Sequence, residues 1–158
     1  MASIANFAVD TEGRFLGKSE HVGESMHHQF ADLWRDMVED GTITEGEFLN
    51  TNFPNHYRTL QECEATFQDD DSHFSAYPLG LRCLDAQTDL VRCPYHERWQ
   101  REGGDAAAHA KRIVPTTRTW SNSTFFAGLD FSRSVEEREA IVDEMFSRYD
   151  ERRRAVYV

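Results

Sequence analysis

The sequence lacks long hydrophobic runs and glycine-rich phosphate loops, and each absence excludes a class of protein. A membrane-spanning helix needs about 20 consecutive apolar residues, and no segment of this chain approaches that length. The first residues carry no basic stretch followed by an apolar one, so no secretory signal is expected. Neither a G-x-G-x-x-G nor a Walker pattern occurs, so no phosphate cradle is predicted.

Basic residues are also scarce. The chain has 17 lysines and arginines against 28 aspartates and glutamates, for a net charge of −11. A surface of that sign repels phosphate, so we expect no nucleic-acid partner and no membrane partner. The three cysteines, Cys63, Cys83 and Cys93, are odd in number and form no C-x-x-C pair. They indicate free, largely buried thiols in a cytoplasmic protein.

The composition that remains is that of a globular protein. Hydrophobic residues make up 39% of the 158 residues, aromatic residues 12% and charged residues 28%. A chain of this length buries about two-thirds of the surface of its unfolded state, which is enough for one core. We therefore expect a single soluble domain over residues 1–158.

Helical signals recur along the chain. Apolar residues follow a helical period in residues 26–38 and again in residues 135–149. Capping boxes, in which Ser or Thr precedes Glu by three residues, predict helix starts at Thr44, Thr59 and Ser134. Further helices are expected just before the Gly103-Gly104 break, in residues 105–114 and in residues 117–129.

Three segments have strand composition instead. Residues 3–9 resemble a buried strand, residues 79–93 fit one bent strand or a hairpin, and residues 155–158 form a short apolar end. The order of strand, helices, strand, helices and strand predicts an α/β fold. In this fold about residues 23–70 form a mainly helical cap, and residues 77–158 supply the remaining strands and helices.

Metal-binding and catalytic patterns are incomplete. Cys93 and His96 have C-x-x-H spacing without a second pair, and the adjacent His27 and His28 would point about 100° apart on a helix. No serine lies in a G-x-S-x-G elbow, and the carboxylate runs are typical of solvated faces. We therefore predict neither a metal site nor a catalytic residue.

Aromatic and imidazole side chains gather in and beside the expected loops. Each is more often a core residue than a ligand-binding one, but together they match the usual lining of a small-molecule pocket, which is apolar with a few polar tips. The candidate substrate-binding residues are His27, His28, His56, Tyr57, Trp120 and Phe125.

Two segments resemble the SABATH family of S-adenosylmethionine-dependent carboxyl methyltransferases, the salicylate, benzoate and theobromine class, and especially its bacterial relatives. "LWRDMVEDGTITEGEFLNTNFPNHYRTLQE" (33–62) is similar to the family's "MV-x-EG-x-I-x-EE" helix followed by "N-x-P-x-Y" and a capped helix. "EAIVDEMFSRYDE" (139–151) is similar to its closing helix, with the pattern "D-x-x-F-x-x-Y". The resemblance covers nearly the whole chain and is to the family's C-terminal, substrate-capping half.

The resemblance implies a fold and an activity. It implies the C-terminal part of a Rossmann-like class I methyltransferase sheet, with residues 3–9 as its fifth strand. The implied reaction transfers a methyl group from S-adenosylmethionine to a small-molecule carboxylic acid. The family's cofactor loop and ribose-binding acid lie in its first half, so we expect this chain alone to be inactive. Its expected partner is a missing N-terminal half or a second copy of itself.

The resemblance also assigns residues. His27 stands where the family often places a pocket Trp, and His56, with Tyr57 next to it, stands where the family places a Tyr. The late pocket segment falls near residues 118–125, which include Trp120 and Phe125. Imidazoles at these positions favour a more polar acceptor than salicylate. The place of an Asp that binds magnesium in some members is Leu49 here, so no metal is implied.

Two other classes fit the sequence. The chain is then either a non-catalytic small-molecule-binding or protein-interaction module derived from the methyltransferase fold, or an unrelated soluble α+β domain. A remnant of a larger sheet would expose residues 3–9 as an unpaired edge and self-associate, whereas an adapted module would be monodisperse.

Overall fold

The computed structural model describes residues 6–9, 13, 25–54, 56–68, 76–89 and 91–156. The chain divides into two compact units, and each is described by itself. The first unit comprises Met1–Gly23 and Asn55–Val91, and the second comprises Glu24–Pro54 and Arg92–Val158.

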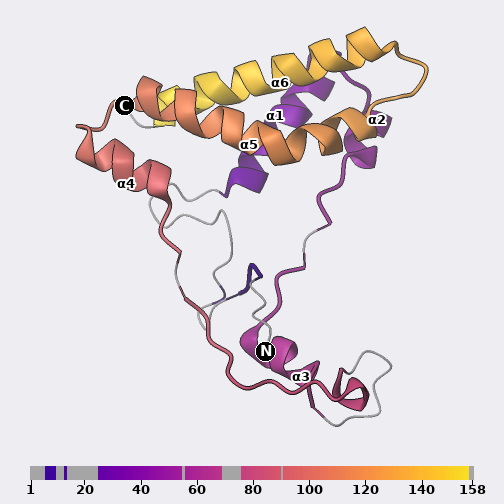
Figure 1. Cartoon of the computed structure of the whole chain (residues 1–158). Helices are drawn as coiled ribbons and strands as arrows, with labels where there is room; N and C mark the ends of the chain where they lie inside the picture. The colour runs from indigo at the N-terminus through magenta and orange to yellow at the C-terminus, as the bar shows by residue number, and fades with distance from the viewer. Residues whose placement is uncertain are drawn as a thin grey trace. The chain divides into compact units, whose positions relative to one another are not determined.

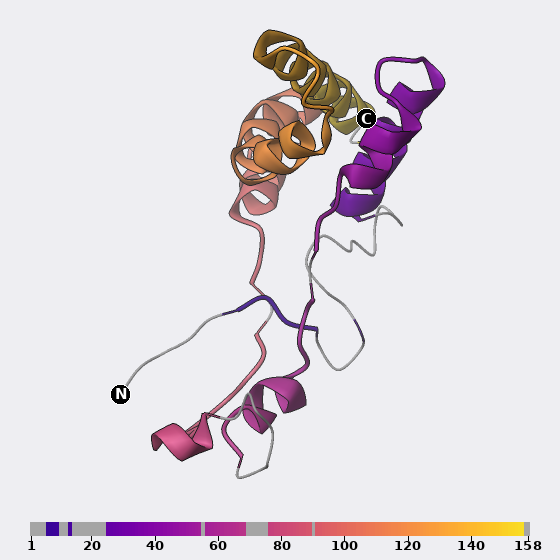
Figure 2. The same ribbon diagram turned by 90° about the vertical axis from the view of Figure 1, so that its right-hand side faces the viewer.

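The second unit is a helical bundle. Its elements are α1 (Met26–Glu39), α2 (Glu45–Asn50), α4 (Pro94–Arg101), α5 (Ala106–Gly128) and α6 (Val135–Val156). The two long helices α5 and α6 lie side by side, and α1 packs against α6 (Figures 1 and 2). The core lies among these three helices. No helix in the described ranges has the length and apolar character needed to cross a membrane.

The predicted apolar stripes form this core. In α1 the buried side chains include Phe30, Leu33, Trp34 and Met37. In α6 they are Ile141, Val142, Met145, Phe146 and Tyr149. Both stripes were predicted from helical periodicity, and both are confirmed except at Val135, the first residue of the predicted α6 stripe, which is 50% exposed. Burial of such side chains away from water is the main driving force for packing the helices together.

Buried hydrogen bonds and an ion pair join α2 to the connection between α5 and α6. Glu47 in α2 is 2% exposed. Its carboxylate accepts hydrogen bonds from Arg133 Nε at 2.6 Å, from Arg133 Nη2 at 2.9 Å and from the backbone N–H of Asp130 at 2.9 Å. It also accepts from the backbone N–H of Thr44 at 2.8 Å, which closes the predicted capping box of α2. One carboxylate thus joins two distant segments.

The C-terminal end of α5 approaches the chain just after α2 very closely. A Cβ atom at Gly128 would overlap Thr51 Oγ1 and lie 3.0 Å from Thr51 Cα. That hydroxyl accepts from Trp34 Nε1 at 3.0 Å and donates to the backbone carbonyl of Glu47 at 2.9 Å. Only glycine leaves room for this packing.

The predicted helices at 105–114 and 117–129 are one continuous helix, α5. Pro115 lies inside it and has no N–H to donate to the preceding turn, which usually breaks a helix. Side-chain hydroxyls of the neighbouring turns bond to carbonyls four residues earlier, as in Thr117 to Ile113 and Ser121 to Thr117. Packing along α6 overrides the local break.

The first unit contains little regular structure among its described residues. It holds α3 (Leu60–Ala65), which begins at the predicted Thr59 cap, and a single 3-10 turn, η1 (Tyr77–Leu79). One isolated parallel bridge pairs Ala8 with Arg58, and the N–H of Val9 donates to the carbonyl of Arg58 at 3.0 Å.

The predicted α/β fold is wrong. No sheet forms in the parts of the chain that the structure describes, and the bridge at Ala8 is the sole remnant of the strand expected at residues 3–9. Residues 3–5 of that strand lie outside the described ranges. Strand composition has little effect without a neighbouring strand to pair with.

The other two predicted strands are also corrected. Apart from Leu79 in η1 and the turn residue Gly80, residues 81–89 and 91–93 have no assigned structure, and Leu90 lies outside the described ranges. Leu81, Leu84 and Val91 are exposed, as are Cys83 and Cys93. The expectation of largely buried thiols is therefore wrong for these two cysteines, while Cys63 is half-buried. Helix α6 continues through Val156, so the expected strand at residues 155–158 is helical where it is described.

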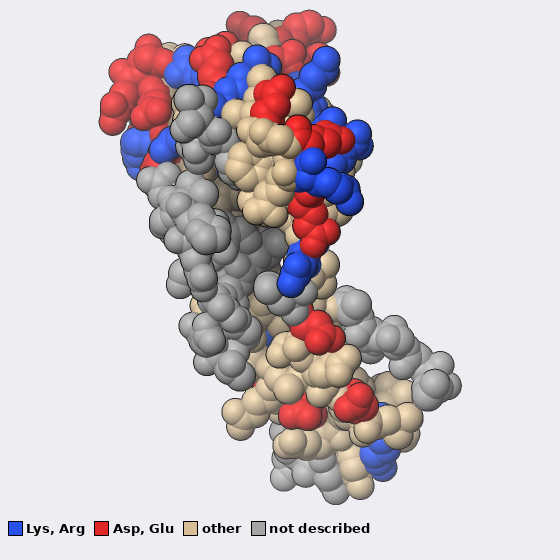
Figure 3. Space-filling model, turned by 90° about the vertical axis from the view of Figure 1, so that its left-hand side faces the viewer, with Lys and Arg blue, Asp and Glu red and all other residues tan. Residues whose placement is uncertain are grey.

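Charges of both signs alternate over the second unit. Figure 3 shows acidic and basic side chains side by side on its surface. Arg148 of α6 lies 2.7 Å from Asp40, which follows α1, and Arg152 lies 3.2 Å from Asp32 of α1. Such exposed pairs each contribute little to stability.

Candidate functional site

Three rings from separate segments meet in the second unit. His27 belongs to α1, Phe53 follows α2, and Trp120 belongs to α5. The ring centroids of His27 and Phe53 are 5.8 Å apart, and those of Trp120 lie 6.2 Å from each of the other two. These distances and the tilted or edge-on orientations are typical of aromatic pairs. We call His27, Phe53 and Trp120 the ring cluster.

The ring cluster stands on the hydrophobic core. Phe125, which is buried, lies 5.3 Å from Phe53, and the buried Phe30 lies 6.2 Å from Trp120. His27 and Phe53 are half-buried, whereas Trp120 keeps 45% of its surface exposed. The cluster therefore presents partly exposed rings on top of the packed core.

The start of α1 positions His27 and His28 differently. Ser25 Oγ accepts from the backbone N–H of His28 at 3.2 Å, and His28 Nδ1 accepts from the backbone N–H of Ser25 at 3.3 Å. His28 is thus the reciprocal partner in the capping box of α1. The structure thus gives His28 a capping role at the start of α1, whereas the His27 ring belongs to the ring cluster.

Electrostatics keep the His27 imidazole neutral. Burial lowers the pKa of His27 from its ordinary value of 6.5, and the neighbouring His28 lowers it further. A neutral imidazole has one donor nitrogen and one acceptor nitrogen. The ring cluster therefore carries no charge at pH 7.

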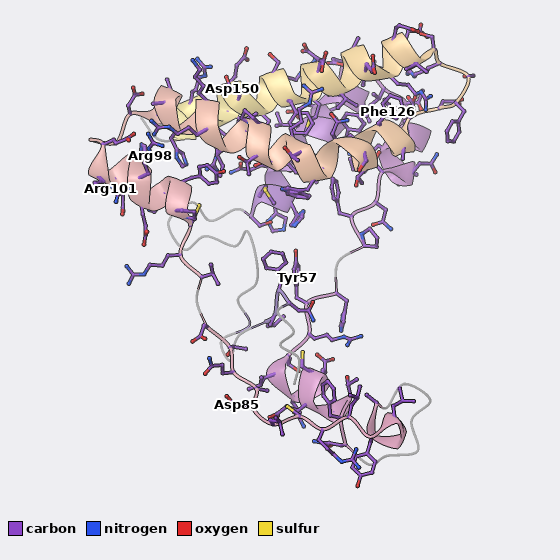
Figure 4. All side chains as sticks on the ribbon, in the orientation of Figure 1. Tyr57, Asp85, Arg98, Arg101, Phe126 and Asp150 are labelled. Atoms are coloured by element: carbon purple, nitrogen blue, oxygen red, sulfur yellow. The ribbon has the colours of Figure 1, made fainter. Side chains whose placement is uncertain are left out.

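The remaining predicted residues lie in the first unit. His56 is exposed, with Nε2 3.8 Å from Glu62 Oε1, and burial raises the pKa of Tyr57, which Figure 4 labels. A hollow of about 400 Å³ is lined by Asn6, Phe7, His56, Tyr57 and Arg58. The structure thus brings together His27, Trp120 and Phe125 in one unit and His56 with Tyr57 in the other.

Sequence reasoning missed Phe53 as a site residue. Phe53 precedes Pro54, and a residue before proline is held in extended geometry. An aromatic residue in that place, after a capped helix, was the available signal. Phe30 was predicted as a core residue, and the structure places it beneath the ring cluster.

A second hollow, of about 540 Å³, opens between α5 and the last turns of α6. Its lining includes the apolar Val114 and Pro115 and the charged Lys111, with the Asp150–Arg154 pair at 2.5 Å (Figure 4 labels Asp150).

The described residues form neither a metal-ligand cluster nor a cysteine–histidine pair. Nowhere in them do three His, Cys, Asp or Glu side chains gather as ligands. Cys93 occupies the N-cap position of α4 without a side-chain capping bond and is exposed. His96, its C-x-x-H neighbour, packs on Trp99 with ring centroids 5.2 Å apart.

The described residues do not fit S-adenosylmethionine, the cofactor implied by the resemblance. Rossmann-like nucleotide sites use a glycine-rich turn after a strand and an acidic residue that holds the ribose. Gly103 and Gly104 instead follow helix α4, with φ of 91° and 77°, and the described ranges contain no sheet strand. They offer this cofactor no cradle.

The motifs that resemble the SABATH family lie mainly in the second unit. Residues 33–50 and 139–151 belong to α1, α2 and α6, and α1 packs against both of the other helices. Comparison of the chain with family models, with curated proteins and with solved structures finds no match.

Proposed function

We propose that this chain is the acceptor-binding part of an S-adenosylmethionine-dependent methyltransferase that acts on a small-molecule carboxylate. One observation carries the proposal. His27 and Trp120, two positions that the SABATH resemblance assigns to the acceptor pocket, lie 6.2 Å apart although they come from distant segments. Phe125, from the same assigned segment, is buried and packs on Phe30 and Phe53, which in turn contact Trp120.

The chemistry requires binding and orientation more than proton transfer. A carboxylate is already ionised at pH 7, so it needs no general base. The work left to this chain is to hold the acceptor in one orientation and to exclude water. Trp120 and Phe53 supply flat apolar faces for this, and His27 adds a neutral ring beside them.

The cofactor-binding residues belong to a partner or to another part of the enzyme. We propose a separate cofactor-binding half as that partner. We propose that the protein acts in the cytoplasm, and the three free cysteines support this location.

A non-catalytic ligand-binding module is the second candidate. It is favoured by the misfit between the described residues and S-adenosylmethionine. In this case the ring cluster binds the same class of ligand without turnover.

Calorimetric titration with a panel of polar carboxylic acids tests acceptor binding. We expect at least one acid to bind, and Trp120→Ala to weaken it about tenfold, which is the usual effect of removing a stacking ring. Trp99→Ala is the matched control, because Trp99 packs on His96 and His109 instead. Equal affinity in the wild type and in Trp120→Ala would refute the site.

Methyl-ester formation separates the two candidates. A cell extract containing the tagged chain is supplied with deuterated S-adenosylmethionine and the best-binding acid, and the ester is measured by mass spectrometry. The methyltransferase proposal predicts labelled ester that falls with Trp120→Ala. Binding without labelled ester supports the non-catalytic module. S-adenosylmethionine is expected not to bind the purified chain at micromolar concentration.

A further inference from the structure

Arg138 of α6 is nearly buried but has no acceptor. Arg138 is 9% exposed. Its Nε atom is buried away from solvent and has no hydrogen-bond partner in the described residues. Neither terminal nitrogen donates to any residue in the described parts of the chain. Those two nitrogens are not among the atoms sealed from solvent, so a small anion can reach them.

Two phenylalanine rings hold the guanidinium. Its Cζ lies 4.3 Å from the ring centroid of Phe126 in α5 and 5.3 Å from that of Phe131 in the connection between α5 and α6. Figure 4 labels Phe126 near the end of α5, next to this connection. Cation–π contacts of this kind occupy the faces of the guanidinium and leave its N–H edges unused.

Other arginines over rings in this protein are also bonded to oxygen. The described examples are Arg35 over Phe48 with Glu45, Arg82 over Tyr77 with the carbonyls of Tyr77 and Leu81, and Arg118 over Phe146 with Asp143. Arg138 is the most buried of the four and the one without an oxygen acceptor in the described ranges.

The terminal nitrogens carry N–H donors that no described residue accepts, and beside two apolar rings a hydrogen bond from them to an anion is stronger than in water. The planar fork of a guanidinium matches a carboxylate with two parallel hydrogen bonds. Phe131 is 82% exposed, and its ring lies beside the Arg138 guanidinium. A ligand bound to the guanidinium can therefore pack its apolar part on this ring. We propose that Arg138, Phe126 and Phe131 form a binding site for a small organic carboxylate with an apolar or aromatic body.

The surroundings favour a small monoanion. Glu137 and Glu139 flank Arg138 in the sequence and oppose a doubly charged phosphate. The narrow exposure of Arg138 admits a carboxylate group more readily than a broad protein surface. The site shares no residue with the ring cluster and does not rest on the proposed function.

Benzoate is the probe, and the side-chain Nε–Hε signals of a ¹⁵N-labelled full chain are the readout. We expect benzoate to shift the Arg138 signal in a saturable way, whereas benzamide, which is neutral and of the same shape, leaves it unmoved. In Arg138→Gln, benzoate binding at this site should be lost. In Arg35→Gln, which removes a ring-stacked arginine that already has Glu45, it should be unchanged.

Phe131→Ala keeps the proposal testable if Arg138→Gln fails to fold, because this ring is exposed. The variant should weaken benzoate severalfold and leave acetate unaffected. Trp120→Ala should leave the Arg138 shift intact, so failure here and failure of the proposed function are distinguishable. The proposal is overturned if benzoate moves no Arg138 signal, if benzamide moves it equally, or if only an acidic peptide does so.

Discussion

At the scale of single residues, Glu47 shows how one carboxylate holds two segments together. Burial raises the pKa of Glu47, but hydrogen bonds from Arg133, from the backbone N–H of Asp130 and from Thr44 lower it more, from 4.5 to about 2. The folded pKa is below the unfolded one. The ionised carboxylate therefore stabilises the fold fully above about pH 5, and this contribution is lost as the pH falls toward 2.

Glu47→Gln tests this contribution. At pH 7 we expect the free energy of unfolding to fall by about 3 kcal/mol, because Arg133 is left without its carboxylate. The difference from the wild type should shrink as the pH is lowered from 5 to 3. Urea denaturation at a series of pH values measures both effects.

Glu45→Gln is the control for charge loss on the same helix. Glu45 pairs with Arg35 at 2.5 Å on the surface, so its removal should cost less than about 1 kcal/mol. A pH-independent difference between wild type and Glu47→Gln would contradict the account given for Glu47.

Gly128 makes a second prediction at this scale. Gly128→Ala should lower the free energy of unfolding by about 2 kcal/mol or more, because the new methyl overlaps Thr51, whose hydroxyl is bonded on two sides. Gly46→Ala is the matched control. Gly46 lies in helix α2, and the nearest atom to a new Cβ there is 3.8 Å away. Gly46→Ala should therefore raise the free energy of unfolding by about 0.5–1 kcal/mol. Thermal denaturation of the two variants should move in opposite directions.

At the scale of elements, helix ends depend on reciprocal caps. The backbone N–H of Ser134 donates to Glu137 at 2.7 Å, and Ser134 Oγ accepts from the backbone N–H of Glu137 at 3.1 Å. Ser134→Ala should destabilise the protein by about 1 kcal/mol, measured by urea denaturation. Ser147→Ala, an exposed position inside α6, should be neutral or slightly stabilising. An equal effect of the two changes would mean that the cap contributes nothing.

The helices could be predicted because their signals are local. A capping box such as Thr44 with Glu47, or a stripe such as that of α6, depends on residues within a few turns. The strands could not be predicted in the same way. Residues such as Leu81 and Val91 have strand composition, but a strand needs a partner, and no local pattern shows whether one exists.

The candidate site was partly predictable for the same reason. His27 and Trp120 were identifiable as aromatic or imidazole residues near loops, and His56 and Tyr57 were indistinguishable from them by residue type. Their division between two units depends on contacts far apart in the sequence. Arg138 gave no signal, because its isolation depends on the rings of Phe126 and Phe131.

At the scale of the whole molecule, the two units differ in how their backbones are bonded. The second unit is built on long hydrogen-bonded helices, whereas residues 81–89 of the first unit have no assigned structure. Hydrogen exchange followed by mass spectrometry should therefore show strong protection in peptides from α5 and α6 and rapid exchange in residues 81–89. Protection of residues 81–89 equal to that of α5 would show that this segment pairs with a strand.

The short connection between α5 and α6, residues 129–134, also bears on how fast the second unit folds. Two long helices joined by so few residues meet with little loss of chain entropy, whereas α1 must return across a much longer stretch of sequence. Folding rates rise when contacts are local. We expect the hairpin of α5 and α6 to form the nucleus, with α1 docking onto it afterwards and sealing the core.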